Sequence, residues 1–224
     1  VPTGTAFVSY NDDGSRDFVF NIAHSAAARF DGGQATIAVL KDFSLDCMHV
    51  SGSALSNAEM CEKILNVCRA LATAGVKLSL DPNMRKELMG NAAYRAAVAE
   101  LMDLCSIFLP SEDDAALLFP GEPFTRYAPR LLARQMQHVV LKKGEHGCEG
   151  MDKAGAHVVL PPHRVTAVDP TGAGDCFCAT FVTLICGGAH DFREALQRAN
   201  AAGALAVMVL GPMEGNTALP AIEA

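Results

Sequence analysis

Residues 168–175 read Val-Asp-Pro-Thr-Gly-Ala-Gly-Asp, the most informative stretch of the chain. We interpret it as the end of a strand followed by a tight turn that opens an apolar helix reaching Cys186. Small residues leave backbone N–H groups bare at the start of that helix, where the helix dipole adds partial positive charge. The turn residues Gly172, Ala173 and Gly174 are therefore suited to hold a phosphate group.

Asp175 lies in the first turn of the same helix, where the dipole favours a negative charge. A carboxylate in that position can accept the proton of an alcohol that attacks a bound phosphorus atom. The alternative interpretation is structural, with an acid at a helix start and glycines in a tight turn. The complete string is far more specific than a Gly-Ala-Gly turn, so we favour the chemical interpretation.

Outward from this stretch, strand-like and helix-like segments alternate, which predicts parallel βαβ units. Ser56 and Glu59 form a capping-box pattern at the start of one helix, Ser111 caps another, and Asp191 caps the last. A glycine-punctuated pair of strands is expected at one edge of the sheet. The predicted strands are 47–51, 76–80, 107–109, 139–142 and a pair within 147–160, and the predicted helices are 56–74, 92–102, 111–119, 172–186 and 191–210.

The first twenty residues are predicted to form a hairpin, with strands at 5–10 and 16–20 around the turn-forming residues 11–14. A two-stranded ribbon is marginal alone, so it should pack on the rest of the fold or on a second subunit. An ordinary edge hairpin is an equally open alternative.

Composition narrows the function further. The chain has 224 residues, of which 50% are hydrophobic and 19% charged, enough for one sizeable core. Its net charge is −7 and no basic patch is evident, which argues against nucleic acid as a partner. The longest apolar runs, 177–186 and 201–210, are too short to cross a membrane. The eight cysteines show no zinc or disulfide spacing and are expected to be reduced and buried, as in a cytoplasmic protein without a signal peptide.

The string at 169–175 resembles, in full, the second signature of the ribokinase or PfkB family of carbohydrate kinases, D-x-T-G-A-G-D. Other landmarks of that family occur in the same order. Val50-Ser51-Gly52 resembles the strand before the sugar pocket, and residues 81–85 resemble the D-P-N-x-R strand end. Residues 141–147 resemble the K-x-G-x-x-G turn near the nucleotide, and Asn200 with residues 201–209 resembles the helix beside adenine. Residues 211–215 resemble the tail of family kinases that act on hexoses or 2-keto-3-deoxy sugar acids.

This resemblance implies an α/β fold of the ribokinase-like, three-layer α/β/α type, with a mostly parallel sheet and a small β-ribbon lid. Residues 1–22 would form part of the lid and 23–224 the α/β nucleotide-binding core. The family's N-terminal portion, with its Gly-Gly-Asn-like sugar-binding turn, has no counterpart here. We therefore expect the chain to cover roughly two-thirds to three-quarters of a family kinase.

The resemblance also implies transfer of the γ-phosphoryl group of ATP to a sugar hydroxyl, with Mg²⁺ bridging the phosphates. Asp175 would be the base, and the amides of 172–174 would bear the developing negative charge. The favoured acceptors are 2-keto-3-deoxygluconate and ketohexoses, ahead of ribose and purine nucleosides; whether K⁺ assists is open. The alternative is an inactive nucleotide-binding fragment or scaffold. A dinucleotide-dependent oxidoreductase is disfavoured, because the glycine turn comes too late and lacks its third glycine.

Several further residues are assigned roles by the resemblance. Arg85 would emerge at the strand edge and steady the transferred phosphate or a sugar-acid carboxylate, although a surface pair with Glu87 is the alternative. Asp81 would brace the following turn through Asn83 and Arg85 rather than perform chemistry. The nucleotide-binding residues would be Lys142, Gly144, Gly147, Thr171, Gly172, Gly174 and Asn200.

The resemblance also bears on a possible metal site and on the lid. Where many relatives read N-x-x-E, this chain has Ser111 and Asp114, so Asp114 would stand in for the glutamate that organises Mg²⁺-bound water; a serine cap with an acidic first turn is the alternative. In the lid, Phe7, Tyr10 and Arg16 are the candidates to touch sugar, with Tyr10 or Arg16 recognising a carboxylate. A homodimer through the lid is expected.

Overall fold

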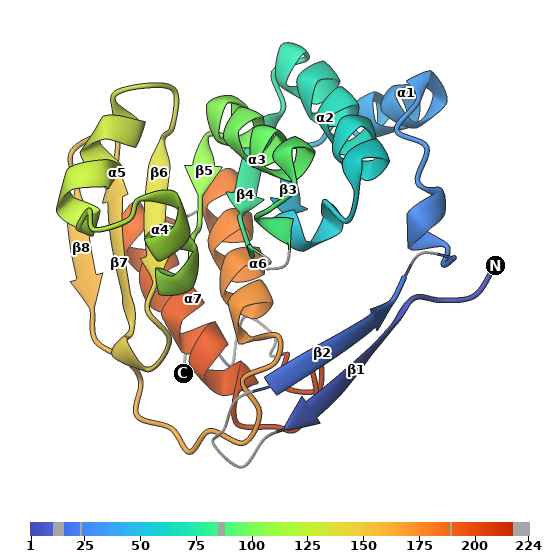
Figure 1. The fold of residues 1–224 in the computed structure, drawn as a ribbon. Helices are drawn as coiled ribbons and strands as arrows, with labels where there is room; N and C mark the ends of the chain where they lie inside the picture. The colour runs from blue at the N-terminus through green and yellow to red at the C-terminus, as the bar shows by residue number, and fades with distance from the viewer. Residues whose placement is uncertain (11–15, 23, 85–87, 189, 217–224) are drawn as a thin grey trace.

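Six strands form one sheet in which spatial order follows chain order (Figure 1). The structure is a computed structural model that describes residues 1–10, 16–22, 24–84, 88–188 and 190–216. The first four strands run parallel, and the last two return antiparallel at one edge, as predicted. The strands are β3 (Cys47–Ser51), β4 (Lys77–Asp81), β5 (Ile107–Phe108), β6 (His138–Lys142), β7 (Cys148–Asp152) and β8 (His157–Leu160).

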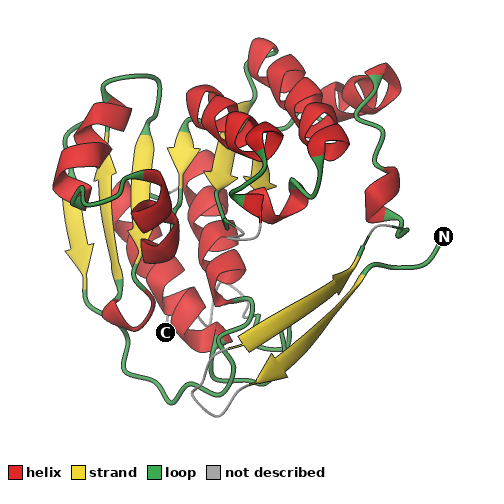
Figure 2. Ribbon diagram, in the orientation of Figure 1, coloured by secondary structure: helices red, strands yellow, loops and turns green. Residues whose placement is uncertain are grey.

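Helices cover both faces of this sheet, which confirms the predicted three-layer α/β/α architecture (Figure 2). Helices α2 to α5 lie on one face and α6 and α7 on the other, while α1 packs against α2. The sequence pattern did not predict the helices at residues 34–42 (α1) and 124–132 (α5). The helices are α1 (Gln34–Asp42), α2 (Ala58–Thr73), α3 (Ala92–Leu104), α4 (Glu112–Leu118), α5 (Phe124–Leu132), α6 (Ala173–Cys186) and α7 (Phe192–Ala206), with short 3-10 turns at Ala27–Arg29, Gly52–Ala54 and Gly144–His146.

The alternation of side chains along the strands divides the core in two. Leu78 and Leu80 of β4 pack toward α2 and α3, whereas Ile107 of β5 and Val140 of β6 pack toward α6 and α7. Both groups are buried, so burial of apolar area on each face fixes the helices to the sheet.

The predicted hairpin is confirmed as a separate two-stranded ribbon of β1 (Thr5–Tyr10) and β2 (Arg16–Asn21). Figure 1 shows it projecting from the body at the end of the molecule where α6 begins. Phe7 and Val19 face each other across the ribbon, and 63% and 65% of their respective surfaces are exposed.

Two predicted helix boundaries are wrong. Asn57, and not Ser56, caps α2, because its side chain accepts a hydrogen bond of 2.9 Å from the amide of Met60. Glu59 instead forms an exposed ion pair with Lys63 at 2.7 Å. Helix α7 ends at Ala206 and not near 210, since the chain turns there.

The strand expected to end at Val168 is also absent. Residues 161–168 run without a strand partner, and two of them are prolines, which have no N–H to donate to a ladder. The amides of Val168 and Asp169 both donate to the carbonyl of Val207, at 2.7 and 3.1 Å. The segment is therefore anchored to the end of α7 and not to the sheet. Within the described ranges, no helix is both long and apolar enough to cross a membrane.

Candidate active site

The carboxyl ends of the parallel strands meet at one edge of the sheet, where ligands of open α/β folds gather. Strand β4 ends at Asp81, and a parallel bridge joins Ser111, just after β5, to Lys142 at the end of β6. The loop after β3 lies so close to the loop after β4 that a Cβ atom on Gly52 would lie 1.8 Å from the carbonyl oxygen of Pro82. Only glycine fits there.

A buried ion pair joins two of these strand ends. Lys142 Nζ donates to Asp81 Oδ2 at 2.5 Å and lies 3.4 Å from the sulfur of Cys178 on α6. Burial alone would lower the pKa of Lys142, but its neighbours Cys178 and Asp81 raise that pKa above its ordinary value. Burial raises the pKa of the Cys178 thiol. Asp81 is 3% exposed, so the positive charge of Lys142 is paired with a buried carboxylate.

Asp81 also braces the next turn, as predicted. Its other carboxylate oxygen accepts a hydrogen bond of 3.2 Å from the amide of Asn83, whose φ of +36° is unusual for a residue other than glycine. The Asn83 side chain donates to Ser51 Oγ at 3.4 Å, which ties the ends of β3 and β4 together. The second part of that prediction, Arg85, lies outside the described residues.

The signature turn at 169–175 is held from both sides. Asp169, 2% exposed, accepts hydrogen bonds from the amide of Thr171 at 2.9 Å and from the amide of Gly211 at 3.0 Å. Gly172 has a φ of +83°, and a Cβ atom there would lie 2.2 Å from the carbonyl oxygen of Pro212. The tail at 211–212 therefore packs directly on the turn, and both backbone conformation and space require glycine at 172.

A cavity of about 960 Å³ opens in front of this turn. The carboxylate of Asp175 is solvent-exposed and lies at the cavity wall, beside the first turn of α6. Thr171 and Gly172 shape the turn and do not line the cavity themselves. Of the predicted residues, the lining includes Ala173, Gly174, Asp175, Lys142, Gly144, Gly147, Asn200, Asp81, Asn83 and Asp114.

Ser111 caps α4 and Asp114 completes the capping box with it, in agreement with the structural alternative for this position. Its Oδ2 accepts from the backbone N–H and the hydroxyl of Ser111, at 2.9 and 2.7 Å, and its Oδ1 accepts from the amide of Met84 at 2.7 Å. Among the described residues, no three acidic, histidine or cysteine side chains cluster as a metal site. Mg²⁺ ordinarily takes only one or two protein carboxylates and completes its shell with water and phosphate, so Asp113 and Asp114 at the cavity wall fit such an ion.

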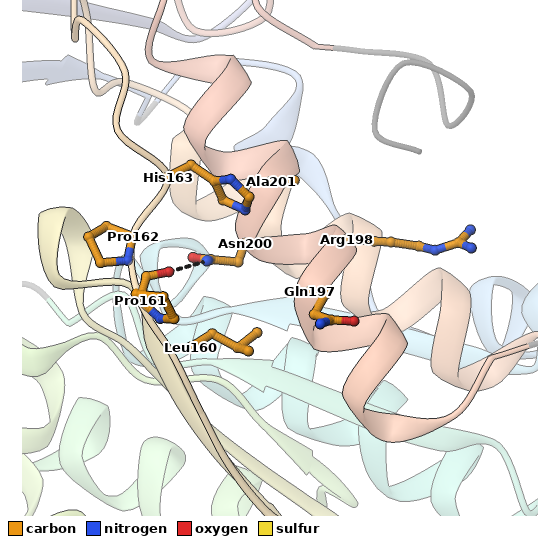
Figure 3. Close-up of a pocket in the computed structure, with 8 residues that line it drawn as sticks. All are labelled: Leu160, Pro161, Pro162, His163, Gln197, Arg198, Asn200 and Ala201. Carbon is orange, nitrogen blue, oxygen red and sulfur yellow. Dashed lines mark hydrogen bonds between the residues drawn. The ribbon is translucent and has the colours of Figure 1, made fainter. Parts of the chain in front are cut away.

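A second cavity of about 360 Å³ adjoins the first, between the segment after β8 and helix α7 (Figure 3). The two cavities share Pro162, His163 and Asn200 in their lining. Asn200 Nδ2 donates to the carbonyl of Pro161 at 2.9 Å, and Figure 3 shows Arg198 pointing away from this contact. The arrangement leaves a mostly apolar slot with the side-chain amides of Gln197 and Asn200 at its wall.

Sequence reasoning missed several residues of the large cavity. Asp113, Glu145, Pro162, His163 and Arg164 line it. The sequence did offer one signal: two consecutive prolines after β8 end the strand, so residues 161–168 had to leave the sheet and could reach the cavity. Asp113 and Glu145 had no such local signal, because only tertiary packing brings them to the cavity.

The lid residues can be placed only in part. Tyr10 and Arg16 are paired in register as the last and first residues of β1 and β2, and their side chains lie outside what the structure describes. Phe7, the third lid candidate, is exposed. Sugar contacts by these residues stay predictions.

Comparisons with known proteins agree with this geometry. The chain is 31% identical over 222 residues to the 2-dehydro-3-deoxygluconokinase of Bacillus subtilis, covering 96% of this chain and 66% of that protein. It is 30% identical over 234 residues to a protein of Arabidopsis thaliana named as a chloroplastic fructokinase-6, covering 99% of this chain and 59% of that protein. The chain thus spans between 59% and 66% of the length of these two relatives.

Solved structures extend the likeness to the fold. Crystal structures of an E. coli protein described as ribokinase II, without ligand and in complex with ATP and Mg²⁺, are 36% identical and superpose with TM-scores of 0.89 and 0.88. Both alignments cover 98% of this chain, and they cover 70% of the ligand-free E. coli chain and 69% of the chain in complex with ATP and Mg²⁺. Residues 1–219 match the family described as pfkB family carbohydrate kinase. The chain belongs to the pfkB family of carbohydrate kinases.

Proposed function

We propose that this protein transfers the γ-phosphoryl group of ATP to a hydroxyl of a small sugar or sugar acid. The observation that carries the proposal is that the first turn of α6, with Ala173, Gly174 and the exposed Asp175, lines one cavity together with Lys142. Family membership supports the same reaction, because the relatives named above are sugar and sugar-acid kinases.

In the proposed reaction, Asp175 accepts the proton of the attacking hydroxyl. The carboxylate is exposed to the cavity, so a sugar hydroxyl can approach it directly. The amides of Ala173 and Gly174, which line the cavity at the start of α6, stabilise the charge that develops on the transferred phosphoryl group, and Gly172 holds the turn in the conformation that presents them. Oxygen attacks phosphorus, the bond to the β-phosphate oxygen breaks, and ADP leaves.

We assign the nucleotide to the two adjoining cavities. The phosphates would lie beside Lys142, Gly144 and Gly147, with Thr171 holding the turn in shape. The base would occupy the apolar slot next to Asn200. Because Asn200 donates to Pro161, its side-chain oxygen is left as an acceptor, which suits the exocyclic amino group of adenine.

Mg²⁺ bound with ATP would neutralise part of the phosphate charge. Asp114 is engaged by three donors, so it would reach such an ion through water, and Asp113 is the exposed acid beside it. Arg164 adds a cation at the same wall. Arg85 remains our candidate to steady the phosphate or a sugar-acid carboxylate.

The acceptors we favour are 2-keto-3-deoxygluconate and ketohexoses. The names of the Bacillus subtilis and Arabidopsis thaliana relatives support these two classes. Tyr10 and Arg16 would contact the sugar from the lid. The exposed apolar pair on the ribbon, Phe7 and Val19, would contact a second copy of the chain. The cytoplasm is the expected compartment. Residues 1–22 would then act as a lid on the core formed by 23–224.

A coupled assay of ADP release tests the proposal. Purified protein is incubated with ATP and Mg²⁺ against 2-keto-3-deoxygluconate, fructose, ribose and a purine nucleoside, with a no-acceptor control. ADP formation that depends on one of the first two acceptors is the expected result. Nucleotide binding, measured by calorimetry, without turnover on any acceptor would favour the nucleotide-binding scaffold instead.

A further inference from the structure

One buried thiol, that of Cys178 on α6, makes polar contacts inside the core. Five of the eight cysteines are buried as expected, and the other three are half-buried: Cys47, Cys176 and Cys186. The S–H of Cys178 donates to Asp81 Oδ2 over 3.5 Å, and its sulfur accepts from Lys142 Nζ over 3.4 Å. Because Lys142 also donates to Asp81, the three side chains form a closed triangle of contacts.

This triangle lies against the first turn of α6. Cys178 comes four residues after Gly174 in the helix, so the two residues lie on the same helix face. A Cβ atom on Gly174 would lie 3.6 Å from Lys142 Nζ, so the ammonium group is in contact distance of the turn. Lys142, Gly174 and Asp175 all line the large cavity. The triangle therefore holds a positive charge beside the amides proposed to bind the transferred phosphoryl group.

The ammonium group of Lys142 keeps one donor for a ligand. It has three N–H groups, and within the described part of the chain it has two partners, Asp81 and Cys178. The lysine side chain is 13% exposed, and it lines the cavity. Phosphate oxygens accept strong, charge-assisted hydrogen bonds from lysine. The third N–H is therefore available to a phosphate bound in front of Gly174.

We propose that the third N–H of Lys142 contacts the γ-phosphoryl group of ATP and that Cys178 is the residue that positions it. This inference rests on the proposed phosphoryl transfer. A lysine stem is flexible, so the contact with Asp81 alone would let the ammonium group turn about the carboxylate. The contact with Cys178 fixes its direction against Gly174. Burial raises the pKa of the Cys178 thiol, so the thiol stays neutral and adds a contact without adding charge.

Binding measurements test this contact without depending on turnover. The Kd for ATP and the Kd for ADP, each with Mg²⁺, are measured by calorimetry. Because only ATP carries the γ-phosphoryl group, Cys178→Ala should raise the Kd for ATP about five- to tenfold and the Kd for ADP less than about twofold. Cys178→Ser should recover most of the ATP affinity, since a hydroxyl both donates and accepts. Cys68→Ala truncates a fully buried thiol of α2, on the other face of the sheet, and as the matched control should change neither constant.

Kinetics with the acceptor that the wild type uses give a second readout. The kcat for ADP release should fall about tenfold in Cys178→Ala and stay within about threefold of the wild type in Cys178→Ser. Equal changes in the Kd for ATP and ADP, or equal losses in the alanine and serine variants, overturn the inference even if a sugar is phosphorylated. A selective loss of ATP affinity in Cys178→Ala, with no turnover by the wild type on any acceptor, supports the contact and contradicts the proposed transfer instead.

Discussion

The carboxyl edge of the sheet and the projecting ribbon differ in how firmly each is held. At the sheet edge, Asp81, Lys142 and Asn83 are joined by hydrogen bonds across three strand ends, and Asp81 is almost fully buried. The ribbon is its own two-stranded sheet, with Phe7 and Val19 largely exposed. The residues proposed for phosphoryl transfer therefore lie on a well-connected frame, whereas the proposed acceptor contacts depend on an element that needs a further surface to pack on.

The largest expected effect falls on the exposed carboxylate of the well-connected frame. Asp175→Asn removes the proposed base without changing size, so kcat for sugar-dependent ADP release should fall about 10²- to 10⁴-fold. ATP binding, measured by calorimetry, should change little. Asp175→Glu is the matched control, because it keeps the charge but moves it. Full activity of the asparagine variant would remove Asp175 from the mechanism.

Breaking the buried ion pair should affect stability most. Lys142→Met leaves the Asp81 carboxylate buried without its cation, and we expect the free energy of unfolding to fall by about 3–5 kcal/mol. Urea denaturation followed by circular dichroism measures this loss. The double variant with Asp81→Asn should recover a large part of it, since no uncompensated charge is left. Equal losses in both variants would mean that the packing of the lysine stem matters and not its charge.

A smaller effect is expected in the apolar slot. Asn200→Leu removes both the contact to Pro161 and the acceptor proposed for adenine, so the Kd for ATP should rise about tenfold. The Kd for GTP, which has no amino group at that position, should change less. Gln197→Leu, at the same slot but one turn away, is the control. An equal loss for both nucleotides would show a structural role alone.

The smallest effect on folding is expected at the ribbon. Phe7→Lys lies on an exposed side chain, so the stability of the single chain should change by no more than about 0.5 kcal/mol. If the ribbon pairs with a second copy, the same substitution should shift the protein toward monomer in sedimentation velocity. Ala6→Lys, on the opposite face of the same strand, adds equal charge and serves as control. Loss of folding would instead place Phe7 in the core contacts of the chain.

The sequence predicted the sheet and the signature turn because their signals are local. Periodicity identified the strands and α2, and the string at 169–175 identified the turn before α6. The same reasoning missed α5, whose Pro129 lies within the helix and reads as a break, and misplaced the cap of α2 by one residue.

Contacts between distant segments were beyond such patterns. Lys142 and Asp81 are 61 positions apart, and nothing near either residue indicates that they pair. The hydrogen bonds that secure Asp169 come from Thr171, which is local, and from Gly211, which is not. Tertiary packing decided these partners, and only the folded chain brings them within reach.

The contact between the tail and the signature turn has a consequence for how the protein is made. Gly211 donates to Asp169, and Pro212 lies against Gly172, so the turn takes its final shape only when the tail is present. During synthesis, residues 169–175 leave the ribosome well before residues 211–212 do. A nascent chain can therefore assemble its sheet before the signature turn is secured, so the turn proposed to bind phosphate is completed after the sheet that supports it.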